Sequence, residues 1–418
     1  MMKNKFISSF LPPMMVVLCL FMMVLSEGCS KSGGPKDQDS ADTMRKPSQT
    51  ELSITPQKPA SATLLFDASG SMAGYLNGGD PRFVGVISAF ENLPDNIKIR
   101  LFGEKEESPM DKAAFEKKLN NRSIKWSHES NLIAMVDSMV RHIDGGDDVC
   151  FLVTDGILSG SNSEINSSPE KKYNITQREK MSKDLSAKLK GKKGYLCALI
   201  VGYSALFKGS YSCYNNAAVQ LNHARPFYVI ALGKWQYIKY IENELENIKK
   251  EGGLSTAYDD IFMIGDLCSY QKLKLSEGEG LTYKKKKWYV KKGVQEITLT
   301  SRLDTLPSYM RTEEYMKENI QLWVGKTLLD QNCYNVSVNN DKLVVSIKSS
   351  QVKGNCELTF KLKFAFPKWI SQKSDENDLD INKNPVKMDK TFNLQYFVEG
   401  FKVLHEGEFV KEISKKFN

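Results

Sequence analysis

The sequence predicts an α/β fold in which a doubly wound, mostly parallel sheet is followed by a mainly antiparallel β domain with a late helix. Two observations lead to this prediction. From residue 60 to about 250, short and almost continuously apolar strands alternate with helical patterns, and strands buried on both faces are typical of a parallel sheet covered by helices. Beyond residue 255, apolar and polar residues alternate within the strands, which indicates an antiparallel sheet with one wet face.

Composition divides the chain of 418 residues into four parts. We expect a signal peptide, a flexible tether, the doubly wound domain and a β-rich domain of unknown role. The expected bounds are, in order, residues 1–28, 29–58, 59–253 and 254–418. The tether is rich in Ser, Gly, Lys, Asp, Gln and Pro, and such a segment has too little apolar surface to fold.

The amino terminus resembles the signal of a bacterial lipoprotein. A basic start leads into the apolar run Phe6–Leu25, and Cys29 follows just before a polar tract. The run is long enough to span a bilayer, so an uncleaved anchor is the alternative, but the sequence around Cys29 favours cleavage. We therefore expect lipid on Cys29 to anchor the protein to a bacterial envelope membrane. The expected membrane is the outer one, with the protein facing the periplasm or the cell surface.

Within the doubly wound domain, apolar spacing predicts five strands and four helices. The strands are expected at residues 63–66, 97–102, 149–154, 195–202 and 227–232. The helices are expected at residues 81–90, 131–143, 175–190 and 235–250. Asp80 and Pro81 form a cap followed by a first-turn proline. Two insertions, 159–174 and 202–225, follow the carboxyl ends of strands that should run parallel. Their polar and aromatic side chains either surround a ligand bound there or pack on themselves, and the sequence leaves both open.

Oxygen-bearing side chains gather at the end of the first strand. The strand runs into Asp67, Ser69 and Ser71 follow at every second position, and Gly70 lets the backbone turn between them. Mg²⁺ prefers six oxygen ligands and keeps some of its waters, so short hydroxyls and carboxylates suit it. In a doubly wound sheet, ligands bind outside the carboxyl ends of the strands. The sequence therefore predicts a hard-cation site at this edge.

The same residues resemble a known family. Asp67-Ala68-Ser69-Gly70-Ser71 has the D-x-S-x-S pattern of the von Willebrand factor type A (vWA) domain, a Rossmann-like fold whose metal site is the metal-ion-dependent adhesion site (MIDAS). Ser130, before Asn131-Leu132 at a helix start, stands where the family usually has Thr. Thr154-Asp155-Gly156 closes a strand as the family's third motif. The three pieces occur in the family's order, and the resemblance covers roughly residues 60–250.

This resemblance implies a ligand set and a function. Ser69 and Ser71 would ligate Mg²⁺, or Mn²⁺ or Ca²⁺ in its place, and Ser130 would do so directly or through water. Asp67 and Asp155 would act mainly through water. A protein ligand would supply an Asp or Glu carboxylate to the open coordination place. The implied function is a membrane-anchored, Mg-dependent protein-binding module for adhesion or complex assembly, without catalytic residues.

Two other classes of function stay open. One is a metal-dependent hydrolase that uses the ion as a Lewis acid, for which His128 is the nearby candidate base in sequence. The other is a scaffold subunit of an envelope complex that needs no metal. A nucleotide-binding protein is disfavoured, because no glycine-rich phosphate loop follows a strand.

The β-rich domain carries no motif that names a function. We expect its strands at residues 294–300, 320–324, 334–338, 343–347 and 357–366. A turn is expected at 339–341 and the late helix at 392–404. The acidic stretch 375–380 has Leu379 where a calcium loop needs its fifth ligand, so a solvated loop is favoured over a calcium site.

Charge and cysteine usage limit the partners and the redox state. The formal net charge is +8, and its most concentrated part is the run Lys284–Lys287. We interpret that run as a solvated loop or a lysine-protected edge strand, and no nucleic-acid partner is expected. Of the eight cysteines, Cys150 and Cys197 lie in apolar strands and should be buried thiols. Whether Cys333 and Cys356 form a disulfide is open, since sequence does not supply the geometry.

Overall fold

The computed structural model describes residues 55–128, 130–157, 175–213, 217–253, 256–265, 273–405 and 407–418. The chain forms two compact units, Met1–Leu52 and Ser53–Asn418, and every described residue belongs to the second. The expected signal peptide, the lipidation site Cys29 and most of the tether lie outside the described residues. Within the described part of the chain, no helix has the length and apolar character needed to cross a membrane.

A six-stranded sheet forms the first half of the fold. Its strands are β1 (Ser61–Asp67), β2 (Asn96–Phe102), β3 (Val149–Thr154), β4 (Cys197–Ser212), β5 (Ala218–Gly233) and β6 (Asp260–Gly265). They lie in the order β2-β1-β3-β5-β4-β6. The five strands expected from the apolar pattern are all present, and the predicted α/β class is confirmed. The sixth strand, β6, lies beyond the expected domain boundary after residue 253, so the sheet does not end there.

Only half of this sheet is parallel. β1 runs parallel to β2 and β3, whereas β5 is antiparallel to β3 and β4, and β4 is antiparallel to β6. The expectation of a mostly parallel sheet was therefore wrong for β5-β4-β6. The reason is that β4 and β5 are joined directly as a hairpin and need no crossover helix. Apolar strands buried on both faces look the same in sequence whichever way they run.

The expected insertion at 202–225 continues the two strands of that hairpin. All sixteen residues of β4 pair with β5. Of the two arrangements left open for its aromatic side chains, the structure has the buried one: Tyr203, Phe207 and Tyr211 are each 1% exposed. They are buried because residues alternate between the two faces of the ribbon. Tyr214 of the same insertion and the loop 159–174 lie outside the described residues.

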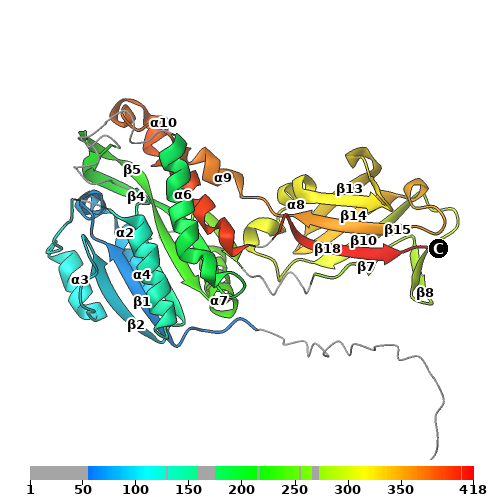
Figure 1. Cartoon of the computed structure of the whole chain (residues 1–418), viewed down its shortest axis with the longest axis horizontal. Coiled ribbons are helices and arrows are strands. Elements are labelled where there is room, and N and C mark those ends of the chain that lie inside the picture. The colour runs from blue at the N-terminus through cyan, green and yellow to red at the C-terminus, as the bar shows by residue number, and fades with distance from the viewer. Residues whose placement is uncertain are drawn as a thin grey trace, which may run out of the picture. The chain divides into compact units, whose positions relative to one another are not determined.

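Within the described residues, the helices that accompany the sheet are α1 (Ala73–Gly78), α2 (Pro81–Glu91), α3 (Lys112–Asn120), α4 (Leu132–Asp144), α6 (Ile175–Leu189) and α7 (Trp235–Lys250). The four expected from sequence are confirmed, while the short α1 and α3 were missed. Asp80 caps α2 by accepting a hydrogen bond from Arg82 N, and Asn131 caps α4 by accepting from Ala134 N. Figure 1 shows α4 and α6 side by side, in agreement with their contacts.

Gly78 lets α1 lie directly on β4. A Cβ atom at this position would stand 1.9 Å from the carbonyl oxygen of Leu206, which no side chain can tolerate. The position therefore requires glycine, and it fixes α1 just after the Asp67–Ser71 loop.

Two four-stranded antiparallel sheets form the second half of the fold, with orders β13-β14-β10-β7 and β12-β11-β15-β18. Their strands are β7 (Ser276–Glu277), β10 (Glu296–Arg302), β11 (Ile320–Val324), β12 (Thr327–Leu328), β13 (Tyr334–Asn339), β14 (Lys342–Lys348), β15 (Glu357–Lys363) and β18 (Phe409–Lys416). Buried and less buried residues alternate along β10 and β14. The prediction of a mainly antiparallel β-rich region is confirmed, with helix α8 (Glu313–Asn319) before β11.

Two tight turns in this region use non-glycine residues with positive φ. Asn340 and Asp341, at φ 49° and 55°, join β13 to β14, as expected for a hairpin turn. The basic run forms the other turn, in which Lys285 and Lys286 have φ 48° and 61°. They join β8 (Leu281–Lys284) to β9 (Lys287–Val290) and are exposed. Cys333 and Cys356 are free thiols, as are Cys150, Cys197 and Cys213.

Residues 368–404 leave the β-rich region and return to the six-stranded sheet before β18. This segment contains α9 (Lys368–Gln372), β16 (Ser374–Asp375), α10 (Pro385–Met388), β17 (Thr391–Phe392), α11 (Leu394–Glu399) and a 3₁₀ turn at Gly400–Leu404. Ser186 on α6 donates a hydrogen bond to the carbonyl oxygen of Gly400, and Figure 1 shows α10 beside β5. The expected late helix is thus present, and it packs on the first half of the fold.

The acidic stretch within this returning segment is only partly solvated. Asp378 is 2% exposed and its Oδ2 accepts a hydrogen bond of 2.8 Å from the Tyr211 hydroxyl. The expected solvated loop was therefore wrong at Asp378, because the β4–β5 hairpin covers it.

A buried ion pair joins α7 to the segment between β10 and α8 in the β-rich region. Lys239 and Glu242 are 3% and 0% exposed and pair with each other. Lys239 Nζ also donates to the carbonyl oxygen of Leu306 at 3.2 Å. Glu242 Oε1 accepts from the backbone and hydroxyl of Ser308 at 2.6 and 2.9 Å. The pair is thus satisfied from both sides, as buried charges must be.

Replacing Glu242 by Ala should destabilise the protein by ~3–5 kcal/mol, because it leaves the Lys239 ammonium buried and unpaired. Urea unfolding followed by circular dichroism measures the effect. Glu244→Ala, on the same helix but without such contacts, is the control and should cost under about 1 kcal/mol. Equal losses in the two variants would contradict the role given to this pair.

Candidate metal centre

The predicted site lies where two parallel strands end side by side. β1 and β3 are neighbours with Phe66 opposite Val153, so Asp67 at the end of β1 lies next to Thr154 at the end of β3. This is the parallel half of the sheet, where ligand sites form outside the carboxyl ends of strands. The antiparallel half does not alter this edge.

The carboxylate of Asp67 is fully buried and hydrogen-bonded. Its Oδ2 accepts from the hydroxyls of Thr154 at 2.7 Å and Ser130 at 3.1 Å, and its Oδ1 accepts from Ser69 N at 2.9 Å. Burial raises the pKa of Asp67, and the hydrogen bonds from Thr154, Ser69 and Ser130 oppose that rise. One carboxylate thus holds three separate segments together.

The loop after β1 is fixed by a neighbouring segment. Ser69 forms a parallel bridge with Ser127; Gly70 N donates to the carbonyl oxygen of Ser127 at 2.8 Å, and Ser127 N donates to that of Ala68 at 2.7 Å. This pairing brings Ser130 to Asp67. The hydroxyls of Ser69 and Ser71 lie 3.3 Å apart, so they face the same space.

Asp155 is the second buried carboxylate and is only half satisfied. It is 1% exposed, and its Oδ1 accepts a hydrogen bond of 3.1 Å from Ile157 N, while its Oδ2 has no hydrogen-bond partner within the described part of the chain. Burial and the negative charge of Asp67 raise the pKa of Asp155, and the Ser71 hydroxyl opposes the rise. A buried carboxylate oxygen without a partner is costly, and a cation beside it would remove that cost.

All five predicted ligands belong to one contact network. Asp67 joins Ser69 and Ser130 by hydrogen bonds, the hydroxyls of Ser69 and Ser71 lie 3.3 Å apart, and Ser71 acts on the pKa of Asp155. Two carboxylates and three hydroxyls form an all-oxygen donor set, which fits Mg²⁺ or Mn²⁺. Four of the five are buried, and Ser71 is the most accessible. Among the described residues, no group of three or more His, Cys, Asp or Glu is placed to hold a metal. Three of the five candidate ligands are serines, which such a group does not include.

Sequence reasoning missed three residues of this site. Thr154 belongs to the Thr-Asp-Gly motif, so its hydroxyl could have been assigned from that motif. Ser127 acts through its backbone, which no residue pattern reveals. Arg225 is a buried cation on β5 whose charge acts on Asp155, and its only signal was a charge at the edge of an apolar strand.

His128, the candidate base for a hydrolase, is exposed. Glu129 lies outside the described residues. The hydrogen bonds given above connect the five ligands with one another, with Thr154 and with backbone groups, and none of them involves a His, Glu or Lys side chain.

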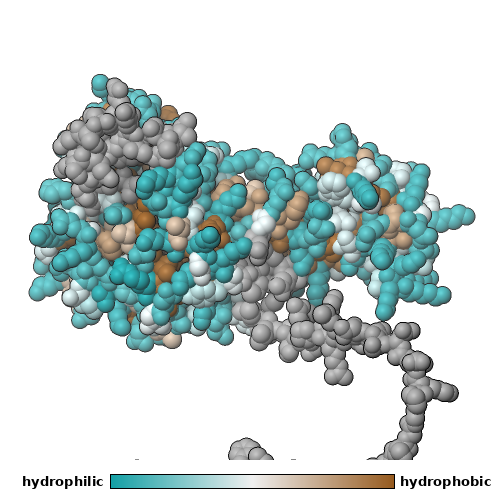
Figure 2. All heavy atoms as spheres, in the orientation of Figure 1, coloured by the Kyte–Doolittle hydropathy of each residue, from teal (hydrophilic) through white to brown (hydrophobic). Residues whose placement is uncertain are grey.

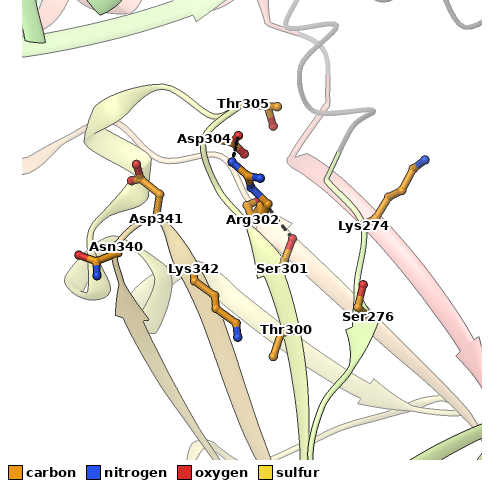
Figure 3. A pocket seen from close by; sticks show the side chains of 10 residues that line it. All are labelled: Lys274, Ser276, Thr300, Ser301, Arg302, Asp304, Thr305, Asn340, Asp341 and Lys342. Atoms are coloured by element: carbon orange, nitrogen blue, oxygen red, sulfur yellow. Dashed lines mark hydrogen bonds and ion pairs between the residues drawn. The ribbon is translucent and has the colours of Figure 1, made fainter. Parts of the chain in front are cut away.

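A pocket of about 660 Å³ lies elsewhere, in the β-rich region. Figure 3 shows its lining at the end of β10 and at the turn before β14, where the side chains of Arg302 and Asp304 point toward each other. These two form an ion pair of 2.8 Å, and Asp341 pairs with Arg311 at 3.3 Å. The lining also includes Lys274 and Lys342, and it shares no residue with the candidate metal centre.

Comparison with known proteins does not name this fold or site: no family model, curated protein or solved structure matches the chain. The geometry of the site therefore carries the functional argument.

Thr154→Val should destabilise the protein by ~1–3 kcal/mol, because it removes the closest hydroxyl donor to a buried carboxylate. The free energy of unfolding in urea measures this. Thr359→Val is a matched control, since Thr359 is a buried strand residue whose hydroxyl pairs with the neutral hydroxyl of Ser414. If Thr154→Val cost no more than the control, the Asp67 carboxylate would not depend on Thr154.

Proposed function

We propose that this protein is a vWA-type, Mg²⁺-dependent protein-binding module that acts through a MIDAS and is tethered to a bacterial envelope membrane by lipid on Cys29. The observation that carries the proposal is that the two buried carboxylates of the site differ in their hydrogen bonding. Asp67 is fully hydrogen-bonded, whereas Asp155 has an oxygen without a partner. A cation between the serine hydroxyls and Asp155 would complete the site.

The residues divide into two roles. Ser69, Ser71 and Ser130 would bind the cation through their hydroxyls, while Asp67 and Asp155 would hold its waters and balance its charge. When bound, the ion supplies an open coordination place for the carboxylate of a partner protein. Because the direct protein ligands are neutral, the ion keeps most of its positive charge for that carboxylate.

In the view of Figure 2, hydrophilic side chains cover most of the described surface and apolar residues lie among them. Tyr203, Phe207 and Tyr211, for which a place around the metal was one of two open arrangements, are buried, so the proposal assigns more of the recognition to the partner's carboxylate.

The alternatives differ in what they require. A hydrolase needs a general base near the ion, and the hydrogen bonds of the site do not supply one. A metal-independent scaffold needs only the folded surface. It would not explain why Oδ2 of Asp155 has no hydrogen-bond partner among the described residues. The antiparallel half of the sheet departs from the mostly parallel sheet that the resemblance implies, but β1 and β3, whose carboxyl ends carry Asp67 and Asp155, are parallel neighbours.

Asp67→Ala and Ser69→Ala should abolish binding of Mg²⁺ and Mn²⁺, because each removes part of the site at the end of β1 while the sheet stays folded. Isothermal titration calorimetry measures the metal affinity, and circular dichroism checks the fold. Asp304→Ala, an exposed acid in the β-rich region, is the control and should bind metal as the wild type does. Retained metal affinity in a folded Asp67→Ala variant would contradict the assignment of the metal site.

The same variants test the role in protein binding. A pull-down from envelope extract with Mg²⁺ should recover a partner that is lost with EDTA and with Asp67→Ala. A partner kept under all three conditions would favour the metal-independent scaffold.

A further inference from the structure

Arg225 is a buried cation that the proposed ligand set does not include. It lies on β5 and is 1% exposed. Its Nη1 and Nη2 donate to the carbonyl oxygens of Met388 and Lys390 at 3.1 and 3.2 Å, and its guanidinium lies 4.5 Å from the ring centre of Tyr211. Among the described residues, Arg225 has no carboxylate within ion-pair distance. The returning segment therefore holds this charge with backbone carbonyls alone.

One negative charge that acts on Arg225 belongs to the candidate metal centre. A guanidinium removed from water needs an opposite charge nearby or a large set of dipoles. The groups around it include Tyr75, Tyr211 and Tyr228, which are neutral because burial raises the pKa of each phenol. The carboxylate whose charge acts on Arg225 is Asp155. This agrees with the strand register, in which Tyr228 on β5 lies opposite Thr154 and Arg225 lies just past the end of β3.

The returning segment also touches the metal-site loop itself. The hydroxyls of Thr391 and Tyr228 lie 3.1 Å apart. Gly156, at φ 72°, fits against the same two residues: a Cβ atom there would stand 3.1 Å from the Tyr228 ring and 3.4 Å from Cγ2 of Thr391. Glycine is needed at this position for both its backbone conformation and its lack of a side chain. The residue after Asp155 thus packs directly on the segment that holds Arg225.

This part of the returning segment, residues 374–393, is held in place at several points. Asp378 accepts from the Tyr211 hydroxyl, and its carbonyl oxygen accepts from the Cys213 thiol at 3.4 Å. Thr391 N donates to the carbonyl oxygen of Lys373, and Asn393 N to that of Asp375, both at 2.8 Å. The carbonyls that hold Arg225 are therefore positioned by a structured element.

We propose that Arg225 is the built-in counter-cation of Asp155, and that cation binding at the metal centre is linked through it to the docking of residues 374–393. This inference rests on the proposed function, since it requires that the site binds a divalent cation. Without the cation, the positive charge of Arg225 acts on Asp155 from beyond ion-pair distance. A divalent cation beside Asp155 repels the guanidinium, so it weakens the hold of Arg225 on the carbonyls of Met388 and Lys390.

The linkage works in both directions. If the bound cation weakens docking, then removing the positive charge of Arg225 must strengthen cation binding by the same coupling. Arg225 is thus a positioning and charge-balancing residue that touches neither the ion nor the partner. It would set the cation affinity lower than the five ligands alone would give.

The test compares Mn²⁺ affinity in the wild type, Arg225→Gln, Arg225→Lys and Asp67→Ala by isothermal titration calorimetry. We expect Arg225→Gln to bind Mn²⁺ at least about fivefold more tightly, because a nearby unit charge acts strongly on a divalent ion in a buried site. Arg225→Lys keeps the charge and should stay within about twofold of the wild type. Unchanged or weaker affinity in Arg225→Gln would overturn the inference. A wild type that does not bind Mn²⁺ would instead reject the proposed function.

A second measurement needs no variant and keeps the inference testable if Arg225→Gln does not fold. Hydrogen–deuterium exchange of the wild type, with and without Mn²⁺, follows the docking of residues 386–393 directly. We expect faster exchange there with Mn²⁺ and unchanged exchange in β14, which serves as the internal control. Unchanged or slower exchange in residues 386–393, in protein that binds Mn²⁺, would overturn the inference.

Discussion

The need to satisfy one buried carboxylate organises the site and the segments around it. Asp67 ends a strand inside the protein, where an ionised group without hydrogen bonds would be unstable. Thr154 from β3, Ser130 from the segment before α4 and the backbone of Ser69 supply those bonds. The three segments that carry the predicted ligands therefore converge because Asp67 requires them. The same convergence leaves Asp155 with an oxygen that has no hydrogen-bond partner among the described residues.

Local sequence patterns predicted the elements and the ligands, but not the direction of the strands. Helical spacing and capping residues placed α2, α4 and α7 closely, because those signals lie within a few residues of one another. The five candidate ligands were selected because their order in the chain is itself a motif, and their binding of a cation stays a prediction. The antiparallel direction of β5 was missed, since an apolar strand such as Phe227–Leu232 records burial and not orientation. Arg225 was missed for a related reason: its partners, Met388 and Lys390, are more than 160 residues away.

The two halves of the fold are not consecutive domains. The chain passes from the six-stranded sheet into the β-rich region. Residues 368–404 then return and pack against α6 and the β4–β5 hairpin, and the chain finally adds β18 to the β-rich region. Composition changes near residue 253, which suggested a boundary there, but β6 and residues 368–404 belong with the first sheet. The buried Lys239–Glu242 pair joins the halves at another point. Residues 368–404 therefore connect the β-rich region covalently to the neighbourhood of the candidate metal centre.

The most direct test of the central claim is a crystal of the protein soaked in Mn²⁺ and measured for anomalous scattering. The account predicts one strong anomalous peak between the hydroxyls of Ser69, Ser71 and Ser130, with Asp155 turned toward it. A well-ordered site without a peak at saturating Mn²⁺, or a peak held by other residues, would contradict it.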